Sequence, residues 1–399
     1  MSTATNLQSL RDAAGDTKRV VGPIGPLGFP LAIAIDGKIY LGGHFGTKGD
    51  ICAQTADAFD NFVATLKSAG ADMRDLVVLR TYYVYEGDRD VTAHWERFTE
   101  VRLRYLADPG PGATALRIAG APTPANEIGI DGIASLAPDR KRIMPAGLWD
   151  WTIPTPFSQA WLVGNTIFMG GQIAADQQGR ATALGDIEEQ MRLALGFLRI
   201  VLDEGGHDLN DLVTMRIGYK AGATPEEGRA NLTKILGVLR ETVKGPLPTI
   251  NAFGVDLLYE GLMLEIDAHS IKSPKQIITP PGCSDWMGFD DTPIAVMCGT
   301  ELYIAGLSAP GGASLVAQTE ASIDRLNLTL RAAGLSYSSL VKLTVFYAPD
   351  EDEAAAAVET ITKSLTDYIP APGPVVSIVR VKNLPFPGQR VQLDAVAIR

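Results

Sequence analysis

The sequence contains few of the residues that build metal and redox sites. It has three cysteines, Cys52, Cys283 and Cys298, and four histidines among its 399 residues. Neither C-x-x-C nor H-E-x-x-H spacing occurs, and three scattered cysteines cannot build a disulfide framework. The glycine-rich loops that bind dinucleotides and nucleoside triphosphates are also missing. We therefore predict a protein that works without a metal or another cofactor.

Long apolar runs and an excess of positive charge are absent as well. No stretch of 18 apolar residues occurs, and 35 Lys and Arg against 46 Asp and Glu give a net charge of −11. An acidic surface repels phosphate backbones, and the polar N-terminal residues do not resemble a secretory signal. We therefore expect a cytoplasmic protein with neither a nucleic-acid nor a membrane partner.

One pattern of residues occurs three times along the chain. Each copy has an amphipathic helical stretch, a glycine and then a β run, and the glycines Gly70, Gly206 and Gly334 are 136 and 128 residues apart. Apolar residues at positions i, i+3 and i+7 precede each glycine, which predicts a buried helix face that ends at a glycine cap. These apolar residues are Phe59, Phe62 and Leu66, then Leu195, Leu198 and Leu202, then Ile323, Leu326 and Leu330.

The other landmarks of the repeat keep the same order. Each copy opens with a β run that ends in small residues and closes with an alternating strand, and a second amphipathic helix, as at 92–106, lies between them. The order β-β-α-β-α-β-β is typical of an α+β domain. Linkers with prolines are expected at 138–152 and 273–284. The sequence thus predicts a tail at 1–19 and three domains at 20–140, 145–272 and 284–399.

These repeats resemble the RidA/YjgF family of reactive-intermediate imine deaminases. PFSQAW at 156–161 and GNTIFMGGQI at 164–173 are similar to the family's opening, and residues 54–70 are similar to its first helix. The family's members are small chains that usually form trimers with ligand clefts between subunits. The resemblance implies three chorismate-mutase-like domains in a covalent pseudo-trimer, with a central β-barrel and helices outside. This unit would be a monomer or form a weak homo-oligomer, with clefts between its domains.

In the resembled family an arginine after the proline-rich loop binds the substrate carboxylate. Its position corresponds here to Ala113 in the first copy, to a residue near Pro248 in the second and to Val376 in the third. No copy keeps the arginine, so the family's 2-imino-acid substrates do not carry over directly, because a guanidinium is what recognises a planar carboxylate.

The family also uses a glutamate in the closing strand to position the attacking water. Its position corresponds to Gly129, Glu265 and Gln392, so one copy alone keeps a carboxylate that can orient or deprotonate water. We therefore predict one principal site, to which the second domain contributes Glu265. The alternative is a glutamate that serves only at a surface or an interface.

Other candidate residues come from the family's cleft positions. Gly171 and Gln172 keep its small-residue corner, where the first copy has His44, a possible acid or base near neutral pH. Phe157 replaces a family tyrosine and could stack on a ligand, and Asn231 lies near the position of a cleft asparagine. For His44 the alternative is a polar loop residue with a hydrogen-bonded ring.

Four arginines interrupt apolar strand segments. Arg80 and Arg216 occupy equivalent positions, where the third copy has Thr344, and Arg117 and Arg380 each lie four residues beyond the lost family arginine. Each of them could bind an anionic group or form a salt bridge between domains, and Arg80 and Arg216 are the stronger substrate-binding candidates. Three aspartates recur in the closing strands, which favours a structural role: Asp131, Asp267 and Asp394.

Together these features predict a cofactor-independent hydrolase that adds water to a C=N or amide-like carbon of a small molecule at an inter-domain cleft. The enzyme class follows from the family resemblance. The alternatives are a chorismate- or pterin-type lyase or hydrolase, and a non-catalytic module that binds a small molecule or stabilises other proteins.

Overall fold

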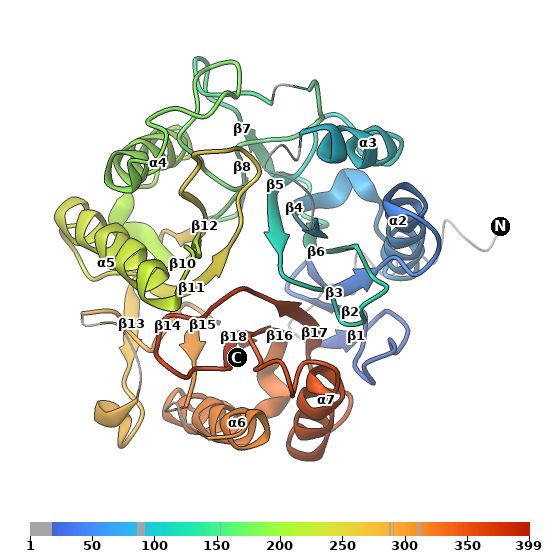
Figure 1. Cartoon of the computed structure of the whole chain (residues 1–399), viewed down its shortest axis with the longest axis vertical. Helices are drawn as coiled ribbons and strands as arrows, with labels where there is room; N and C mark the ends of the chain where they lie inside the picture. The colour runs from blue at the N-terminus through green and yellow to red at the C-terminus, as the bar shows by residue number, and fades with distance from the viewer. Residues whose placement is uncertain (1–17, 86–91, 152, 287–288, 290, 310–312) are drawn as a thin grey trace.

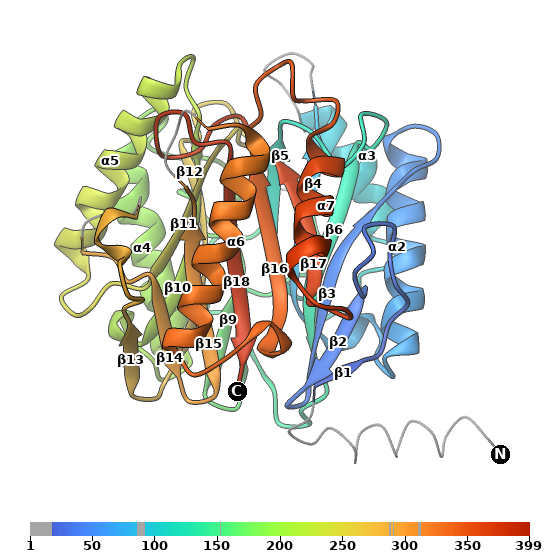
Figure 2. The same cartoon turned by 90° about the horizontal axis from the view of Figure 1, so that it is seen from below.

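The computed structural model describes residues 18–85, 92–151, 153–286, 289, 291–309 and 313–399. Within them, three sheets of six strands surround a common centre, and the helices lie on the outside (Figure 1). Seen from the side, the strands of all three sheets run along the same central axis (Figure 2). The predicted α+β fold of three repeated domains is confirmed.

Each domain repeats one order of elements. Domain 1 contains β1 (Arg19–Val20), β2 (Ala32–Ile35), β3 (Lys38–Phe45), α2 (Ile51–Ser68), β4 (Leu76–Val84), α3 (Thr92–Arg102), β5 (Gly112–Ile118) and β6 (Ile128–Ser135). Domain 2 contains β7 (Lys141–Ile143), β8 (Ala160–Val163), β9 (Thr166–Met169), α4 (Ile187–Glu204), β10 (Leu212–Lys220), α5 (Pro225–Thr242), β11 (Thr249–Val255) and β12 (Leu264–Ile271). Domain 3 contains β13 (Lys275–Ile278), β14 (Ala295–Cys298), β15 (Glu301–Leu307), α6 (Leu315–Ala332), β16 (Leu340–Tyr347), α7 (Ala357–Tyr368), β17 (Val375–Arg380) and β18 (Val391–Ile398).

The strand order is the same in the three sheets. In domain 1 it is β1-β2-β3-β6-β4-β5, and every neighbouring pair is antiparallel except β4 and β5. The short strands β7 and β13 lie in segments that the sequence predicted as linkers, so domains 2 and 3 begin before residues 145 and 284. Composition does not indicate these strands, because a short edge strand is held by backbone hydrogen bonds rather than by apolar side chains.

The first helix of each domain packs its predicted face on its own sheet. Phe59, Phe62 and their seven counterparts are all at most 1% exposed. Each helix then ends at the predicted glycine, and Gly70, Gly206 and Gly334 have φ angles of +79°, +75° and +71°. Glycine adopts this left-handed conformation without a steric penalty, so it stops the helix and turns the chain toward the next strand.

The inner faces of the sheets bury one another around the axis in two apolar layers. The first apolar layer joins residues of all three domains, among them Ile33, Val78, Phe168, Tyr303 and Val396. The second apolar layer, farther along the same strands, includes Tyr82, Phe157, Phe253, Phe346 and Val379. The position between Val78 and Tyr82 on the inner face of β4 is occupied by Arg80. Polar residues therefore separate the two layers.

The sheets surround the axis without closing into one hydrogen-bonded barrel. Neighbouring sheets in the described residues are joined at isolated bridges, such as those between Gly112 and Ser158 and between Gly120 and Arg380. The central β-barrel that the resemblance implies is thus built, in the described residues, from three separate sheets around the axis. None of the helices in the described part combines the length and the apolar character needed to cross a bilayer.

Truncation of the helix face should destabilise the protein strongly. Leu326 is fully buried on α6, so Leu326→Ala should lower the free energy of unfolding by about 2–5 kcal/mol, because it leaves a cavity. Leu328→Ala on the same helix is the control, since Leu328 is 39% exposed and should cost much less. Urea unfolding of both variants measures the difference, and equal losses would contradict the packing described.

Candidate active site

Three equivalent contacts join the domains. The outer strand of each sheet, β5, β11 or β17, lies against the next domain, where it meets β9, β15 or β3. The family's cleft positions fall at these contacts. Each contact can therefore contribute to stability and also hold a ligand.

A pair of buried charges crosses the contact between domains 1 and 2 at the axis. The guanidinium of Arg80 donates from Nε and Nη2 to the carboxylate of Asp267 at 3.2 and 3.0 Å. Arg80 is 3% exposed and Asp267 is 5% exposed. Two parallel bonds of this kind fix both the distance and the orientation of the two domains.

An equivalent pair crosses the contact between domains 2 and 3. Nε of Arg216 donates to Asp394 at 2.7 Å, and Nη2 donates to the hydroxyl of Thr344 at 2.8 Å. Thr344 occupies the position that an arginine has in the other two domains, as the strand register shows. Because Thr344 carries no charge, domain 3 cannot form an ion pair with Asp131 of domain 1 from this position.

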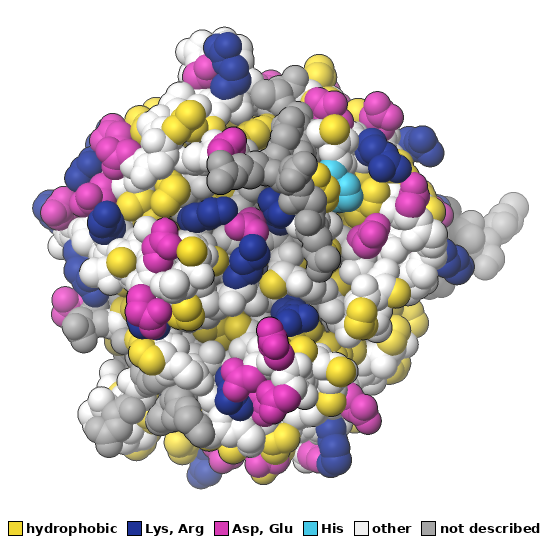
Figure 3. All heavy atoms as spheres, in the orientation of Figure 1, with side chains coloured by type: hydrophobic (Ala, Val, Ile, Leu, Met, Phe, Trp, Pro, Cys, Tyr) yellow, Lys and Arg dark blue, Asp and Glu magenta, His cyan; other side chains and the backbone are white. Residues whose placement is uncertain are grey.

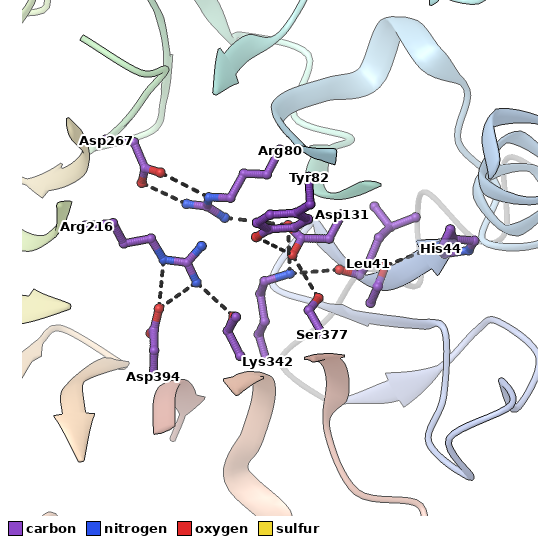
Figure 4. Close-up of polar contacts among 12 residues, drawn as sticks. Leu41, His44, Arg80, Tyr82, Asp131, Arg216, Asp267, Lys342, Ser377 and Asp394 are labelled. Atoms are coloured by element: carbon purple, nitrogen blue, oxygen red, sulfur yellow. Dashed lines mark hydrogen bonds and ion pairs between the residues drawn. The ribbon is translucent and has the colours of Figure 1, made fainter. Parts of the chain in front are cut away.

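Lys342 completes the ring from domain 3 to domain 1. Its Nζ lies 3.2 Å from Asp131 and donates to the carbonyl of Leu41 at 2.9 Å, and Ser377 donates to Asp131 at 2.8 Å. Lys342 precedes Thr344 by two residues, so both side chains lie on the same face of β16. Figure 4 shows the complete ring of three acids and three bases around the axis.

The bases of the ring favour the ionised form of two of its acids, Asp131 and Asp267. Burial alone would raise the pKa of Asp131, but Lys342, Arg80 and Arg216 outweigh it and lower this pKa to about 2. Burial likewise opposes ionisation of Asp267, whereas Arg80 and Arg216 lower its pKa below the ordinary value. Arg80 and Arg216, the proposed substrate-binding arginines, are thus used in ion pairs between domains. This agrees with their salt-bridge alternative.

Removing one member of the ring should cost far more than removing a surface charge. Arg80→Met leaves Asp267 buried without its main partner, so the free energy of unfolding should fall by about 3–5 kcal/mol. Replacing both as Arg80→Met with Asp267→Leu should recover part of this loss. Arg192→Met is the control, because the pair of Arg192 and Glu189 is half exposed and contributes little. Equal effects in urea unfolding would contradict a stabilising ring.

Glu265 lies at the contact between domains 1 and 2, on the same face of β12 as Asp267. Its Oε1 accepts a hydrogen bond from the backbone N–H of Ala115 on β5 at 3.3 Å, and the side chain is 5% exposed. Gly171 provides the space for it, because a Cβ at this position would lie 2.0 Å from Oε1. The N–H of Gly171 also donates to the carbonyl of Ala113 at 2.9 Å. The predicted corner and carboxylate are thus brought together against β5.

The surroundings of Glu265 favour its neutral form. Burial raises the pKa of this carboxyl to about 8, the bond from Ala115 opposes the shift, and the charge of Asp267 adds to it. At neutral pH Glu265 therefore carries a proton, so it is an acid first and becomes a base only once this proton has left. The sequence predicted a base and could not show this reversal.

The pH dependence of stability tests this protonation state. Because the folded pKa is about 8 and the model value is 4.5, the folded protein keeps a proton that the unfolded chain releases between these values. Stability should therefore fall as pH rises from about 5 to 8, by at most about 1.4 kcal/mol per pH unit. Glu265→Gln removes this contribution, so its advantage over the wild type in urea unfolding should grow with pH. Parallel curves would show that Glu265 titrates normally.

At the two other contacts the position equivalent to Glu265 does not hold a carboxylate. Gly129 faces the ring of Phe45, which lies 2.3 Å from where a Cβ of Gly129 would be, so an aromatic side chain fills the contact between domains 3 and 1. Gln392 lies beside Gly306 at the contact between domains 2 and 3, and its Nε2 is buried without a hydrogen-bond partner. The strand register confirms that Gly129, Glu265 and Gln392 occupy equivalent positions.

The position of the lost family arginine is apolar at all three contacts. The register aligns Ala113 and Val376 with Ile250, two residues beyond the position near Pro248 that the sequence suggested.

Gln172 and Phe157 are buried in domain 2 rather than free for a ligand. Nε2 of Gln172 donates to Oε1 of Gln159 at 2.8 Å, and the side chain is fully buried. Phe157 stacks on Trp149 with ring centroids 5.6 Å apart and belongs to the second apolar layer. Both residues lie inside domain 2 and support the surface that contacts domain 1.

His44 and Asn231 lie away from the carboxylate. The ring nitrogens of His44 lie 2.9 Å from the carbonyl of Gly42 and 2.9 Å from the hydroxyl of Thr65 on α2, and burial lowers its pKa to about 4. These contacts fit the alternative in which His44 is a residue with a hydrogen-bonded ring. Asn231 on α5 donates to the carbonyl of Lys220, which holds the end of β10.

Arg117 and Arg380 lie at one end of the axis. Arg117 donates to the carbonyl of Tyr85 and lies 4.0 Å from Asp256 of domain 2, which also pairs with Lys220 and with Lys382 of domain 3. Lys and Arg side chains gather around the centre of this face (Figure 3). Arg380 lines a groove of about 690 Å³ between domains 2 and 3. The groove also contains charged residues of both signs: Glu226, Arg229, Asp350, Lys382 and Arg390.

The sequence analysis did not predict two buried cations. Lys342 supplies the third base of the ring, from a position two residues before Thr344. The alternation of residues in VKLT, which puts Lys342 and Thr344 on one face of β16, could have indicated this. Arg102 is 2% exposed on α3 at the domain 1–2 contact. With Trp95 at position i, Phe98 lies at i+3 and Arg102 at i+7 of the same buried helix face. Among the described residues, no group of three His, Cys, Asp or Glu side chains is placed to hold a metal ion.

These observations define an α+β protein of three repeated domains with a buried carboxyl at one inter-domain contact. A family model described as Endoribonuclease L-PSP matches residues 152–272 and 293–399, which is more than half of the chain. The chain belongs to this family, the RidA/YjgF family that its repeats resemble. The match omits domain 1, in which the family's glutamate and glutamine positions hold Gly129 and His44.

The curated relatives match about one domain each. A RutC family protein of Pyrococcus abyssi is 40% identical over 65 residues, which are 16% of this chain and 51% of that protein. The chain thus spans about half the length of this relative. A RutC family protein of Pyrococcus horikoshii is 29% identical over 29% of this chain and 87% of its own length. A 2-iminobutanoate/2-iminopropanoate deaminase of Dermatophagoides farinae is 26% identical over 28% of this chain and 83% of its own length.

The solved structures that match differ in how much of this chain they cover. A chorismatase matches 60% of this chain and 76% of its own, at 17% identity and a TM-score of 0.48. A putative endoribonuclease of Thermotoga maritima matches 34% of this chain and 99% of its own, at 27% identity and a TM-score of 0.29.

Proposed function

We propose that this protein hydrolyses a C–N bond of a small molecule at the contact between domains 1 and 2. The observation that carries the proposal is the buried Glu265, whose carboxyl has a pKa raised to about 8 and accepts a hydrogen bond from Ala115 on β5. Family membership supports it, because relatives of this chain are named 2-iminobutanoate/2-iminopropanoate deaminase. The reaction needs a proton donor and a proton acceptor, and Glu265 can be each in turn.

The proton of Glu265 moves in two steps of such a reaction. Glu265 first protonates the nitrogen of the C=N bond, which makes the carbon more electrophilic and leaves a carboxylate. This carboxylate then accepts a proton from the water whose oxygen bonds to that carbon. Glu265 passes this proton to the nitrogen and takes up the hydroxyl proton of the intermediate as the C–N bond breaks. The products are a carbonyl compound and ammonia or an amine, and Glu265 is protonated again. A carboxyl with a pKa near 8 is suited to both transfers.

Conversion of Glu265 to an amide should abolish this activity. An amide neither gives nor takes the proton, so Glu265→Gln should reduce kcat/KM by about 10²–10⁴-fold without loss of folding. Ammonia release from a panel of imines, enamines and cyclic amides measures the effect. In the wild type kcat/KM should decline as pH rises above about 8, because the acid form of Glu265 disappears.

Gln392→Ala is the matched control, since Gln392 occupies the equivalent position at another contact and should keep most activity. Gly129→Ala is unsuitable, because its Cβ would collide with Phe45. Full activity of Glu265→Gln would refute the proposal. If no compound of the panel is turned over, while a ligand still protects the protein against unfolding, the non-catalytic binding module replaces the hydrolase.

A further inference from the structure

The groove that Arg380 lines is large enough for a small organic molecule. It lies between domains 2 and 3, at the end of the axis opposite the C-terminus (Figure 2). Residues 221–229, 348–350 and 380–390, at the ends of β10, β16 and β17, form most of its walls. Its volume of about 690 Å³ is in the range of ligand sites in proteins. Loops of two domains thus build a concave surface of ligand size.

This groove is separate from the positions that correspond to the family's clefts. At the contact between domains 2 and 3 these positions hold Ile250, Gly306 and Gln392. None of the three is among the described residues that line the groove. Glu265 lies at a different contact, between domains 1 and 2. A ligand of the groove would therefore meet residues that the hydrolysis proposed for Glu265 does not use.

The charged residues that line the groove carry an excess of positive charge. They are two acids and four bases: Glu226, Asp350, Arg229, Arg380, Lys382 and Arg390. The chain as a whole has a net charge of −11, so the groove has the opposite sign to the protein. Lys and Arg side chains also gather around the centre of this face (Figure 3). A concave surface of this composition attracts anions.

The acids of the groove are more exposed than the bases with which they pair. The side chain of Glu226 is 72% exposed, whereas that of its partner Arg229 is 27% exposed. Asp350 is 57% exposed and its partner Arg390 is 22% exposed. Arg390 is also held by Glu353 at 2.9 Å. Pairs with such exposed acids contribute little, so an anion that enters the groove can replace the acids while the arginines stay in the walls.

Lys382 extends the positive surface toward the axis. It pairs with Asp256, which also pairs with Lys220 at 2.7 Å and lies 4.0 Å from Arg117. Three bases thus share one carboxylate. Lys220 and Lys382 are partly exposed, and each ammonium has three donors, so both can bind a further anion. The excess of positive charge in the groove is therefore not cancelled by these neighbours at the axis.

We propose that this groove is a binding site for a phosphate group. Arg229 of domain 2 and Arg380 of domain 3 supply guanidinium groups, which donate paired hydrogen bonds to phosphate oxygens. A phosphate monoester carries up to two negative charges, which matches the excess of two bases in the walls. Leu384 and Phe386 add apolar surface for an organic part of the ligand. The site does not depend on the reaction proposed for Glu265.

Calorimetric titration in phosphate-free buffer tests the site, with phenyl phosphate, inorganic phosphate and phenol as probes. Phenyl phosphate should bind saturably to the wild type, and phenol should not bind. Arg380→Met should weaken this binding about tenfold, because it removes a charged hydrogen-bond donor. Arg199→Met is the control, since it removes an exposed arginine of α4 and should bind as the wild type does. Should Arg380→Met fail to fold, Arg229→Met gives the same test from domain 2.

Removal of a competing acid should have the opposite effect. Asp350→Asn frees Arg390 from its exposed partner, so phenyl phosphate should bind about two- to fivefold more tightly. Asp352→Asn removes an exposed acid outside the groove and should change the affinity much less. Equal affinities of the wild type and the folded arginine variants, equal effects of the two aspartate variants, or no saturable binding of either phosphate would overturn the site.

Two sources of the phosphate group are separated by the same titrations. Tighter binding of phenyl phosphate than of inorganic phosphate assigns the groove to an organic phosphate, as Leu384 and Phe386 lead us to expect. Equal binding of the two assigns it to free phosphate. Glu265→Gln should bind phenyl phosphate as the wild type does, so loss of turnover in that variant and loss of binding in Arg380→Met are independent results.

Discussion

The structure depends on a ring of charges that are buried where three domains meet. Each domain gives an acid to the ring and receives a base from its neighbour: Arg80 pairs with Asp267, Arg216 with Asp394 and Lys342 with Asp131. Two apolar layers enclose the ring along the axis and keep water away from it. Buried pairs add little stability over an apolar replacement, but they penalise every arrangement that leaves one charge alone. The layers supply the hydrophobic driving force, and the ring selects one relative position of the domains.

Since the ring holds the domains together at the axis, the contacts farther out are free to differ. Only the second copy keeps a carboxylate at the family's glutamate position, and Phe45 and Gln392 occupy the other two contacts. A trimer of identical subunits could not vary in this way, because each substitution would appear three times. The fused chain thus separates assembly, which needs all three contacts, from chemistry, which needs one.

The sequence predicted the architecture because packing is periodic. The three helix faces, the glycine caps and the equivalent positions of Gly129, Glu265 and Gln392 all follow from spacing along the chain. The candidate site was predicted less well, because its properties depend on neighbours that spacing does not show. The partners of Arg80 and Arg216 belong to other domains, and the pKa of Glu265 depends on burial by β5. The position of Arg102 could have been predicted, because this arginine lies in the apolar stripe of a helix with Trp95 and Phe98.

The chain connects domain 1 to domain 2 and domain 2 to domain 3, but it does not connect domain 3 back to domain 1. This third contact is a seam at which two parts of one molecule associate as separate proteins would. Asp131 accepts bonds there from Ser377 and also from Tyr82 of its own domain, and Lys38 of domain 1 lies 2.5 Å from Glu301 of domain 3. If this contact opened, the exposed surfaces of domains 1 and 3 could pair with those of a second molecule. The dense polar matching across it therefore protects the chain against exchange of domains between copies.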